Sequence, residues 1–249
     1  MWTLLHGFTG SPESYTRIVR HLGVERRALI PALTGHGDDW RGRAAASFEG
    51  EVARLLDLHS DLERPRLLCG YSLGARVALG LLSRAPGMFD AALLIGLHPG
   101  LDSPSAREER RALDAQRARL LRERGLAAFM TEWEALPLFA SQRALPSDRR
   151  DEQRGLRLAH DPEGLARSLE VLGLAEMPDY RQAMASLEVP ITLMTGSLDP
   201  KFSKMATELA DQNVQIRAQR VDGVGHDVLL EAPSIVATAL AAMAELAQR

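Results

Sequence analysis

The chain of 249 residues has few of the residues that mark extracellular, membrane or nucleic-acid-binding proteins. Its single cysteine, Cys69, excludes a disulfide bond within the chain and is compatible with a reducing compartment. No stretch approaches the roughly 20 apolar residues that a membrane-spanning helix needs. The net charge of −3 and the isoelectric point near 6.2 argue against a nucleic-acid partner.

Signals for cofactors and for export are missing as well. There is no Gly-x-Gly-x-x-Gly, no Walker phosphate loop and no clustered set of Cys and His ligands, so we expect neither a cofactor nor a bound metal. The first apolar residues follow no basic leader, and we therefore expect no signal peptide and a cytoplasmic location. The composition, 45% hydrophobic and 25% charged, fits a globular protein without an obligatory protein partner.

Lysine is also scarce. Lys201 and Lys204 are the only two lysines among 30 basic residues, so 28 are arginines. Seven of these arginines lie between residues 107 and 124, where we expect most of them to be solvated. An arginine therefore needs support from its position in a motif before it is given a role.

Short apolar runs alternate along the chain with helical patterns, which predicts an α/β fold with a mostly parallel sheet. We expect about six strands, at residues 2–5, 27–30, 67–69, 91–97, 189–195 and 214–221. Apolar residues have helical spacing at residues 14–22, 48–56, 202–211 and 233–247. These helices would cover a sheet whose strands run in the same direction.

Residues 102–187 differ in character from the rest of the chain. They contain no convincing strand and carry helix-like patterns rich in Arg, Glu, Leu and Ala, interrupted by prolines. A structureless loop of this length is improbable in a compact domain, so we expect an inserted helical cap over a pocket. The predicted organisation is a core in two parts, residues 1–101 and 188–249, with the cap between them.

The sequence Gly70-Tyr71-Ser72-Leu73-Gly74 joins a predicted strand to a predicted helix. This is the context of a nucleophile elbow, a tight turn that holds a serine in a strained backbone conformation above a sheet. The two glycines let neighbouring main chain pass close by. Ser72 is therefore the candidate nucleophile.

Two residues complete a candidate catalytic triad with Ser72. Asp199 stands just beyond a late strand and His226 beyond the last one, which gives the Ser, Asp, His order of the α/β-hydrolase fold. Asp199 is followed by a proline and could also cap a helix, a role compatible with orienting His226. Asp102 and Asp222 are alternative acids, but neither has so clear a position at the end of a strand.

The first predicted strand leads into a glycine-rich loop, residues 6–10, in the position that supplies half of an oxyanion hole in this fold. We expect the backbone N–H groups of Phe8 and Leu73 to stabilise an oxyanion that develops during the reaction. His6 is expected to brace the loop rather than to transfer protons. His98 is assigned to a turn, with a position at the border of the site as the alternative.

This pattern resembles a known family, the 2-succinyl-6-hydroxy-2,4-cyclohexadiene-1-carboxylate synthases of menaquinone biosynthesis, which have the α/β-hydrolase fold. The resemblance covers nearly the whole chain, and residues 110–114, 133–139 and 199–202 distinguish it from the many esterases that share the elbow and the triad. Members of the family eliminate pyruvate from a cyclohexene carboxylate that bears succinyl and enolpyruvyl groups. The resemblance thus implies that Ser72 acts as a base on a small polycarboxylate.

The resemblance also implies which side chains bind the substrate, namely Arg76, Arg110, Arg157, Tyr71, Trp133 and Phe139. Arg154 is an alternative to Arg157, because residues 142–157 match the family pattern only loosely. Arg76 follows Ser72 by one helical turn and can share its side of the helix. A guanidinium suits a carboxylate, whereas an esterase for apolar esters would gain little from a buried cation. Lys201 is assigned no chemistry.

The chain departs from the family pattern in two places. It starts nearly at the oxyanion strand, so the two antiparallel strands that usually open the fold are expected to be absent. Residues 227–233, which follow His226, lack an asparagine-rich pattern found in the family. Two other functions stay open: an esterase or C–C bond hydrolase in which Ser72 attacks a carbonyl, and a non-catalytic binding module with this fold.

Overall fold

The computed structural model describes residues 1–24, 27–59 and 63–247. Within these residues six strands form one parallel sheet in the order β2-β1-β3-β4-β5-β6. This confirms the predicted α/β fold with a parallel sheet of six strands. The strands are β1 (Trp2–Leu5), β2 (Ala28–Leu29), β3 (Leu67–Tyr71), β4 (Ala91–Ile95), β5 (Ile191–Gly196) and β6 (Ile216–Val221).

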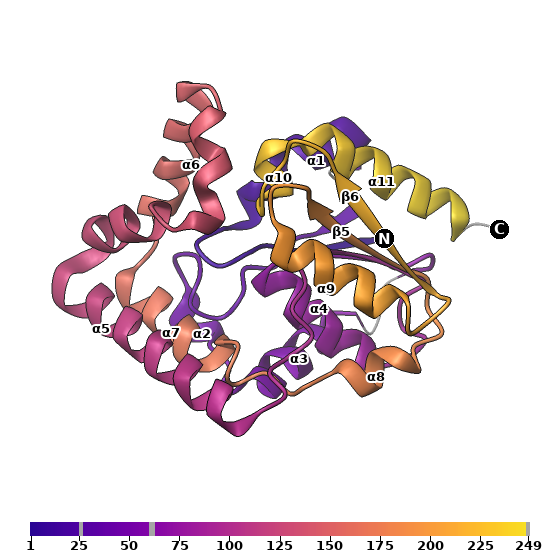
Figure 1. Cartoon of the computed structure of the whole chain (residues 1–249), viewed down its shortest axis with the longest axis horizontal. Coiled ribbons are helices and arrows are strands. Elements are labelled where there is room, and N and C mark those ends of the chain that lie inside the picture. Colours follow the sequence, from indigo (N-terminus) through magenta and orange to yellow (C-terminus); the bar gives the residue numbers. More distant parts are fainter. Residues whose placement is uncertain (25–26, 60–62, 248–249) are drawn as a thin grey trace.

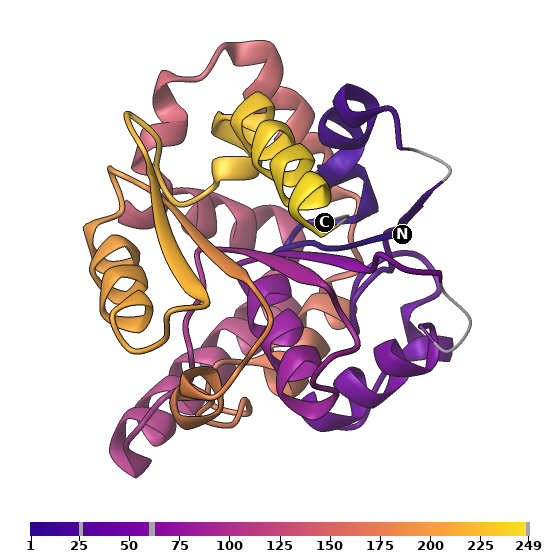
Figure 2. The same cartoon turned by 90° about the vertical axis from the view of Figure 1, so that its right-hand side faces the viewer.

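Helices cover both faces of the sheet (Figure 2). Successive residues of a strand point to opposite faces, so Leu68 joins one hydrophobic core and Cys69 the other. Burial on both faces explains why the strands are continuous apolar runs in the sequence. One face carries α1 (Thr16–Leu22) and α11 (Pro233–Leu246); the other carries α3 (Phe48–Asp57), α4 (Leu73–Arg84) and α9 (Pro200–Ala210).

Cys69 lies in the middle of the sheet and is fully buried. Its Sγ atom is 3.7 Å from the hydroxyl of Tyr15, which donates a hydrogen bond of 3.0 Å to the carbonyl of Leu5. Burial raises the pKa of the Cys69 thiol to about 12. Cys69 therefore has the small, inert, packing role expected of a buried cysteine.

The two edges of the sheet are protected in different ways. β2 pairs with β1 through only two residues, which leaves a very short edge. β6 exposes the side chains of Arg217 and Arg220, and exposed charge discourages pairing with another strand. A short edge on one side and exposed charge on the other both discourage pairing with a further strand.

A helical segment connects β4 to β5 and lies beside the sheet, at the left of Figure 1. Its longest helix, α5 (Pro104–Glu134), packs against α7 (Pro162–Leu172) around a small separate core that includes Leu121, Phe129 and Leu165. Gly125 has a positive φ of 77° and interrupts α5, which therefore consists of two helices joined at a kink. The other elements are η3 (Pro137–Ala144), α6 (Ser147–Leu158) and α8 (Arg181–Ala185).

The boundaries of the cap at residues 102 and 187 stay a prediction. From Val171 onward the segment contributes side chains to the core beneath the sheet, among them Met184 of α8. Prolines begin several of its helices, as expected for a residue without a backbone N–H. Pro137 and Pro162, which interrupt the helical patterns of the sequence, each stand in the first turn of a new element.

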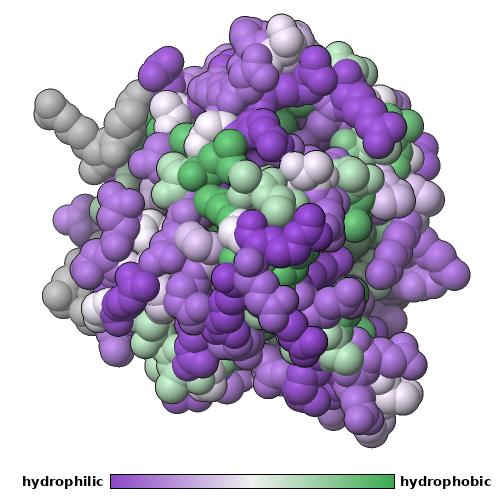
Figure 3. All heavy atoms as spheres, turned by 90° about the vertical axis from the view of Figure 1, so that its left-hand side faces the viewer, coloured by the Kyte–Doolittle hydropathy of each residue, from purple (hydrophilic) through white to green (hydrophobic). Residues whose placement is uncertain are grey.

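The helix predicted at residues 14–22 corresponds to α1 together with the end of η1 (Pro12–Tyr15), which directly precedes it. Two four-residue helices, α2 (Trp40–Arg43) and α10 (Val228–Glu231), have no counterpart in the prediction. One turn is too short for the apolar spacing that predicts a helix. Among the described residues, no helix combines the length and apolar character needed to cross a membrane. Figure 3 shows one face of the molecule, where a hydrophobic area is surrounded by hydrophilic side chains.

Candidate active site

Ser72 occupies a strained turn between β3 and α4. Its φ is +51° and its ψ is −105°. Residues with a side chain rarely adopt this backbone conformation, so the surrounding turn must impose it. A Cβ atom on Gly70 would lie 2.4 Å from the carbonyl oxygen of Gly74, and one on Gly74 would lie 2.0 Å from that of Leu5. Only glycine fits at these two positions, as the elbow pattern predicts.

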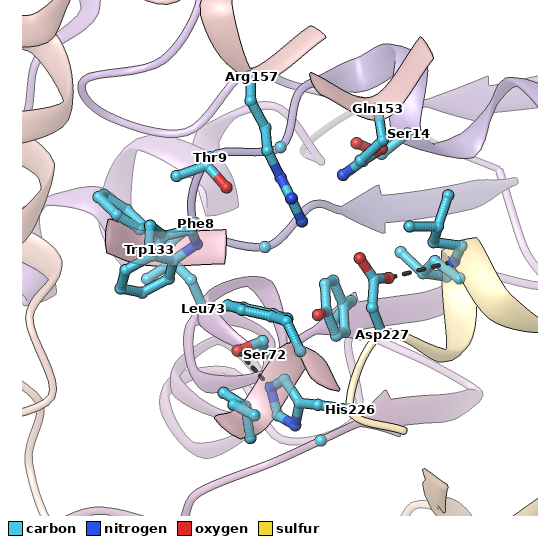
Figure 4. A pocket seen from close by; sticks show the side chains of 18 of the residues that line it. Phe8, Thr9, Ser14, Ser72, Leu73, Trp133, Gln153, Arg157, His226 and Asp227 are labelled. Atoms are coloured by element: carbon cyan, nitrogen blue, oxygen red, sulfur yellow. Dashed lines mark hydrogen bonds between the residues drawn. The ribbon is translucent and has the colours of Figure 1, made fainter. Parts of the chain in front are cut away.

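The structure brings Ser72, His226 and Asp199 together. His226 Nε2 lies 3.1 Å from Ser72 Oγ (Figure 4), and His226 Nδ1 lies 2.7 Å from Asp199 Oδ2. With Asp199 accepting from Nδ1–H, Nε2 is free to accept the serine proton. His226 and Asp199 are both buried, which shields this chain of hydrogen bonds from water.

Asp199 also caps a helix, because its Oδ1 accepts a hydrogen bond of 3.3 Å from the backbone N–H of Phe202. The cap and the contact with His226 use different carboxylate oxygens, so the two expected roles coexist. The alternative acids lie elsewhere: Asp102 and Asp222 have side chains 71% and 91% exposed and face Arg181 and Arg220.

The glycine-rich loop of residues 6–10 is held by buried imidazoles. His6 Nε2 accepts a hydrogen bond of 3.1 Å from the N–H of Leu33, and His6 Nδ1 lies 2.8 Å from the carbonyl of Gly7. Burial lowers the pKa of His6 to about 4, which keeps the ring neutral. His160 Nε2 contacts the carbonyl of Thr9 at 3.2 Å. These contacts fix residues 6–10, and His6 braces the loop as expected.

A cavity of about 470 Å³ opens beside Ser72. Phe8, Leu73 and His226 line it together with all six side chains expected to bind substrate. Asp199 lies behind His226 and is not part of the lining. The structure therefore gathers the predicted residues around one space, under the helical segment.

Three arginines gather on one side of the cavity around a single acid, Asp114. Arg110 Nε donates to Asp114 Oδ2 at 2.7 Å, and Arg117 Nη1 donates to Asp114 Oδ1 at 3.4 Å. Arg76 Nη1 donates to the carbonyl of Leu172 at 2.7 Å. Burial and then the charge of Arg110 lower the pKa of Arg76. The group has more positive than negative charge and can accept an anionic ligand.

Arg157 enters the cavity from α6 (Figure 4) and its side chain is only 4% exposed. It donates to Glu134 Oε1 at 3.1 Å and lies over the ring of Phe139, 5.5 Å from its centroid. Arg154, the alternative, pairs with Glu134 on the outside, where its side chain is 38% exposed. Of the two, it is Arg157 that lines the cavity.

Aromatic rings form the wall of the cavity. Trp133 stacks on Phe129 at 5.6 Å, contacts Phe8 edge to face at 5.1 Å and lies 5.6 Å from Phe139. Trp133 thus packs in the core of the helical segment and also lines the cavity. Tyr71 lies 5.5 Å from the His226 ring, and burial raises the pKa of Tyr71, so that its phenol stays neutral.

Several polar side chains that were given no role in the site also line the cavity. Lys201 is one of them, and His98, for which a position at the border of the site was the alternative to a turn, is another. Burial, followed by the charge of Lys201, lowers the pKa of His98 to about 4. Both follow the carboxyl ends of parallel strands, a position that could have indicated a site. Arg117 and Arg149 also line the cavity; Arg117 stands seven residues after Arg110, on the same helical face. Among the described residues, no cluster of three or more metal-ligand side chains is found.

Comparisons with known proteins agree with this geometry. Residues 4–239 match the model of the alpha/beta hydrolase family. The 2-succinyl-6-hydroxy-2,4-cyclohexadiene-1-carboxylate synthase of Salmonella typhimurium is 34% identical over 97% of this chain and 92% of its own. The solved structure of MenH from S. aureus has a TM-score of 0.92 and 27% identity, covering 100% of this chain and 94% of that chain. A malate-bound esterase from Thermogutta terrifontis has a TM-score of 0.82 and 25% identity, covering 100% and 90%.

Proposed function

Since the chain belongs to the alpha/beta hydrolase family and its curated relatives are synthases of one kind, we propose that it is a 2-succinyl-6-hydroxy-2,4-cyclohexadiene-1-carboxylate synthase. It would eliminate pyruvate from 2-succinyl-5-enolpyruvyl-6-hydroxy-3-cyclohexene-1-carboxylate, in menaquinone biosynthesis. The proposed enzyme is a carbon–oxygen lyase that uses the hydroxyl of Ser72 as a base.

The reaction needs one proton to leave carbon and one C–O bond to break. Ser72 takes the proton from ring carbon 2, beside the succinyl ketone, and passes its own proton to His226. The freed electron pair forms a double bond between carbons 2 and 3, and the existing double bond moves to carbons 4 and 5. The bond from carbon 5 to the enolpyruvyl oxygen then breaks, and its electron pair leaves with the oxygen as the enolate of pyruvate. This enolate becomes pyruvate by gaining one proton at its methylene carbon, and the imidazolium of His226 gives up the proton that it received.

The residues around Ser72 fit this sequence of steps. Asp199 holds His226 with Nε2 toward the serine at 3.1 Å and stabilises the imidazolium that forms. Removal of a proton next to a ketone places negative charge on the ketone oxygen. The backbone N–H groups of Phe8 and Leu73 are the proposed donors to that oxygen, and such donors are typically worth about 3 kcal/mol each in the transition state.

The observation that carries the proposal is the cluster of Arg76, Arg110 and Arg117 beside the reacting hydroxyl, with Asp114 as their shared acid. A buried guanidinium without a full counter-charge is costly. A substrate with three carboxylates offsets that cost, because carboxylates bind guanidinium groups in two-point contacts. An ester with apolar arms would not offset that cost.

The test is the release of pyruvate from the enolpyruvyl substrate, followed through lactate dehydrogenase and the oxidation of NADH. We expect turnover by the native protein and its loss in Ser72→Ala. Absence of pyruvate with a folded native protein would reject the lyase.

A second candidate is an ester hydrolase, favoured by the fold shared with the malate-bound esterase and by the Ser72–His226–Asp199 hydrogen bonds. Here Ser72 attacks a carbonyl and forms an acyl-enzyme. Turnover of nitrophenyl esters and labelling of Ser72 by a fluorophosphonate, without release of pyruvate from the enolpyruvyl substrate, would favour this reaction.

A further inference from the structure

The cavity extends beyond Arg157 to a second polar region made by α6, η1 and α10. Its lining includes Ser14, Arg149, Gln153, Arg157 and Asp227. Figure 4 shows Ser14, Gln153, Arg157 and Asp227 on one side of the pocket and Ser72 with His226 on the other. This region shares no hydrogen-bond partner with the group around Asp114, which comes from α4 and α5.

The spacing on α6 explains why these side chains meet. Residues 149, 153 and 157 are four apart, so they lie along one face of the helix. Arg149 and Arg157 are fixed at the ends of this row. Arg149 Nη2 donates to the carbonyl of Leu230, and Arg157 donates to Glu134 and Gln142.

Each of these two guanidinium groups keeps one buried donor without a partner. The Nε atoms of Arg149 and Arg157 are both inaccessible to solvent and form no hydrogen bond within the described part of the chain. A buried donor left unpaired costs about 1–3 kcal/mol. A ligand oxygen can remove that cost if the guanidinium groups turn toward the cavity, which both arginines line.

The charge at this end comes from both signs. Five acids lie near Arg17, Arg149, Arg154 and Arg157: Glu134 contacts Arg154 and Arg157, Glu152 contacts Arg17, Glu13 lines the cavity, Asp227 accepts the N–H of Leu230 at 3.1 Å, and Glu231 accepts hydrogen bonds from Ser141 and Gly225. Burial raises the pKa of Asp227 and of Glu231, which reduces the negative charge of both. With these two acids weakened, an anion in the cavity meets the guanidinium groups of Arg149 and Arg157, which both line it.

We propose that Arg149 joins Arg157 to form a second anion subsite, which binds one carboxylate of the substrate on an arm away from the Asp114 cluster. The inference rests on the proposed function and adds Arg149 as a binding residue. With this subsite, the cavity would bind carboxylates at two separate positions of the substrate rather than a single anionic group.

The test compares Arg149→Ala with Arg150→Ala, a neighbouring arginine whose side chain is exposed. In the pyruvate-release assay we expect Arg149→Ala to raise KM by about tenfold or more with kcat within about twofold, since the lost contact binds ground state and transition state alike. Arg149→Lys should recover part of the affinity because it keeps the charge. Arg150→Ala should match the native protein.

A purely structural role predicts something different. If Arg149 served only to hold α10 through Leu230, its loss would disturb His226 nearby and lower kcat, and Arg149→Lys would rescue nothing. That outcome, or an unchanged KM in Arg149→Ala, would overturn the inference. Pyruvate release by the native protein would still support the proposed lyase activity. If the native protein releases no pyruvate, the proposed function fails and the subsite for its substrate fails with it.

A double-mutant cycle adds a sharper criterion. If Arg149 and Arg157 hold the same carboxylate, the double variant should raise KM by less than the product of the fold-increases of Arg149→Ala and Arg157→Ala. A fold-increase equal to that product would show that the two arginines act independently and would contradict a shared carboxylate. Thermal unfolding of each variant shows whether the fold is intact.

Discussion

Replacement of Arg76 by alanine is the most direct test of the cationic side of the cavity. Arg76 stands one turn after Ser72 on α4, lines the cavity and donates through Nη1 to the carbonyl of Leu172. A hydrogen bond between a charged donor and a substrate carboxylate is worth about 1.5–3 kcal/mol. Its loss should therefore lower kcat/KM for pyruvate release by about 10- to 150-fold.

Stability separates this loss of binding from a loss of structure. Arg76 is half-buried and feels the charge of Arg110, and both desolvation and repulsion disfavour its own charge. Its removal takes away those unfavourable interactions together with one hydrogen bond, so we expect the unfolding temperature of Arg76→Ala to stay near that of the native protein. The matched control is Arg84→Ala, on the same helix with a side chain 57% exposed.

The assay is the coupled measurement of pyruvate over a range of substrate concentrations, at fixed ionic strength. We expect Arg84→Ala to behave like the native protein and Arg76→Lys to fall between the native protein and Arg76→Ala. Equal kcat/KM values for the native protein and Arg76→Ala, both folded, would refute the role of this cluster in binding an anion.

Three further predictions concern the base, the cavity acid and the buried imidazole. Ser72→Ala should lower kcat by about 10²-fold or more while substrate binding, measured by calorimetry, stays near native. Equal turnover would show that another group removes the proton. Burial raises the pKa of Asp227, so its carboxylate gains charge as the pH rises through that pKa and repels an anionic substrate. The KM of the native protein should therefore increase with pH, and Asp227→Asn should lose this increase; identical pH profiles would contradict it. The pKa of His6 falls from 6.5 to about 4 on folding, so the free energy of unfolding should drop as the pH falls from 6.5 toward 4, by up to about 3 kcal/mol. Urea titrations should show a shallower drop for His6→Gln, and an equal drop would exclude His6 as its source.

Much of the fold could be predicted because its determinants are local. Strands buried on both faces are short apolar runs, and β3 ends in a turn whose glycines are required by sterics. Asp199 and His226 were found through their positions after β5 and β6, and the structure brings both to Ser72. Their order along the chain was informative because the carboxyl ends of parallel strands meet at one edge.

The other residues of the cavity could not be predicted, because their positions depend on contacts between segments that are distant in the sequence. Arg149 and Arg157 are two of many arginines, and their burial arises only when α6 packs beside η1 and α10. The choice between Arg154 and Arg157 likewise depends on which side of α6 faces inward. Asp227 was noted only as a departure from a family pattern, because its burial and its cap of α10 are set by the chain around it.

The thiol of Cys69 in β3 can be used to measure how often the core of the protein opens. Cys69 is fully enclosed, and its raised pKa leaves almost no thiolate at neutral pH. A disulfide reagent can therefore modify it only after the sheet separates from the helices around it. The rate of that modification measures how often the central strands become exposed, with no label added to the chain.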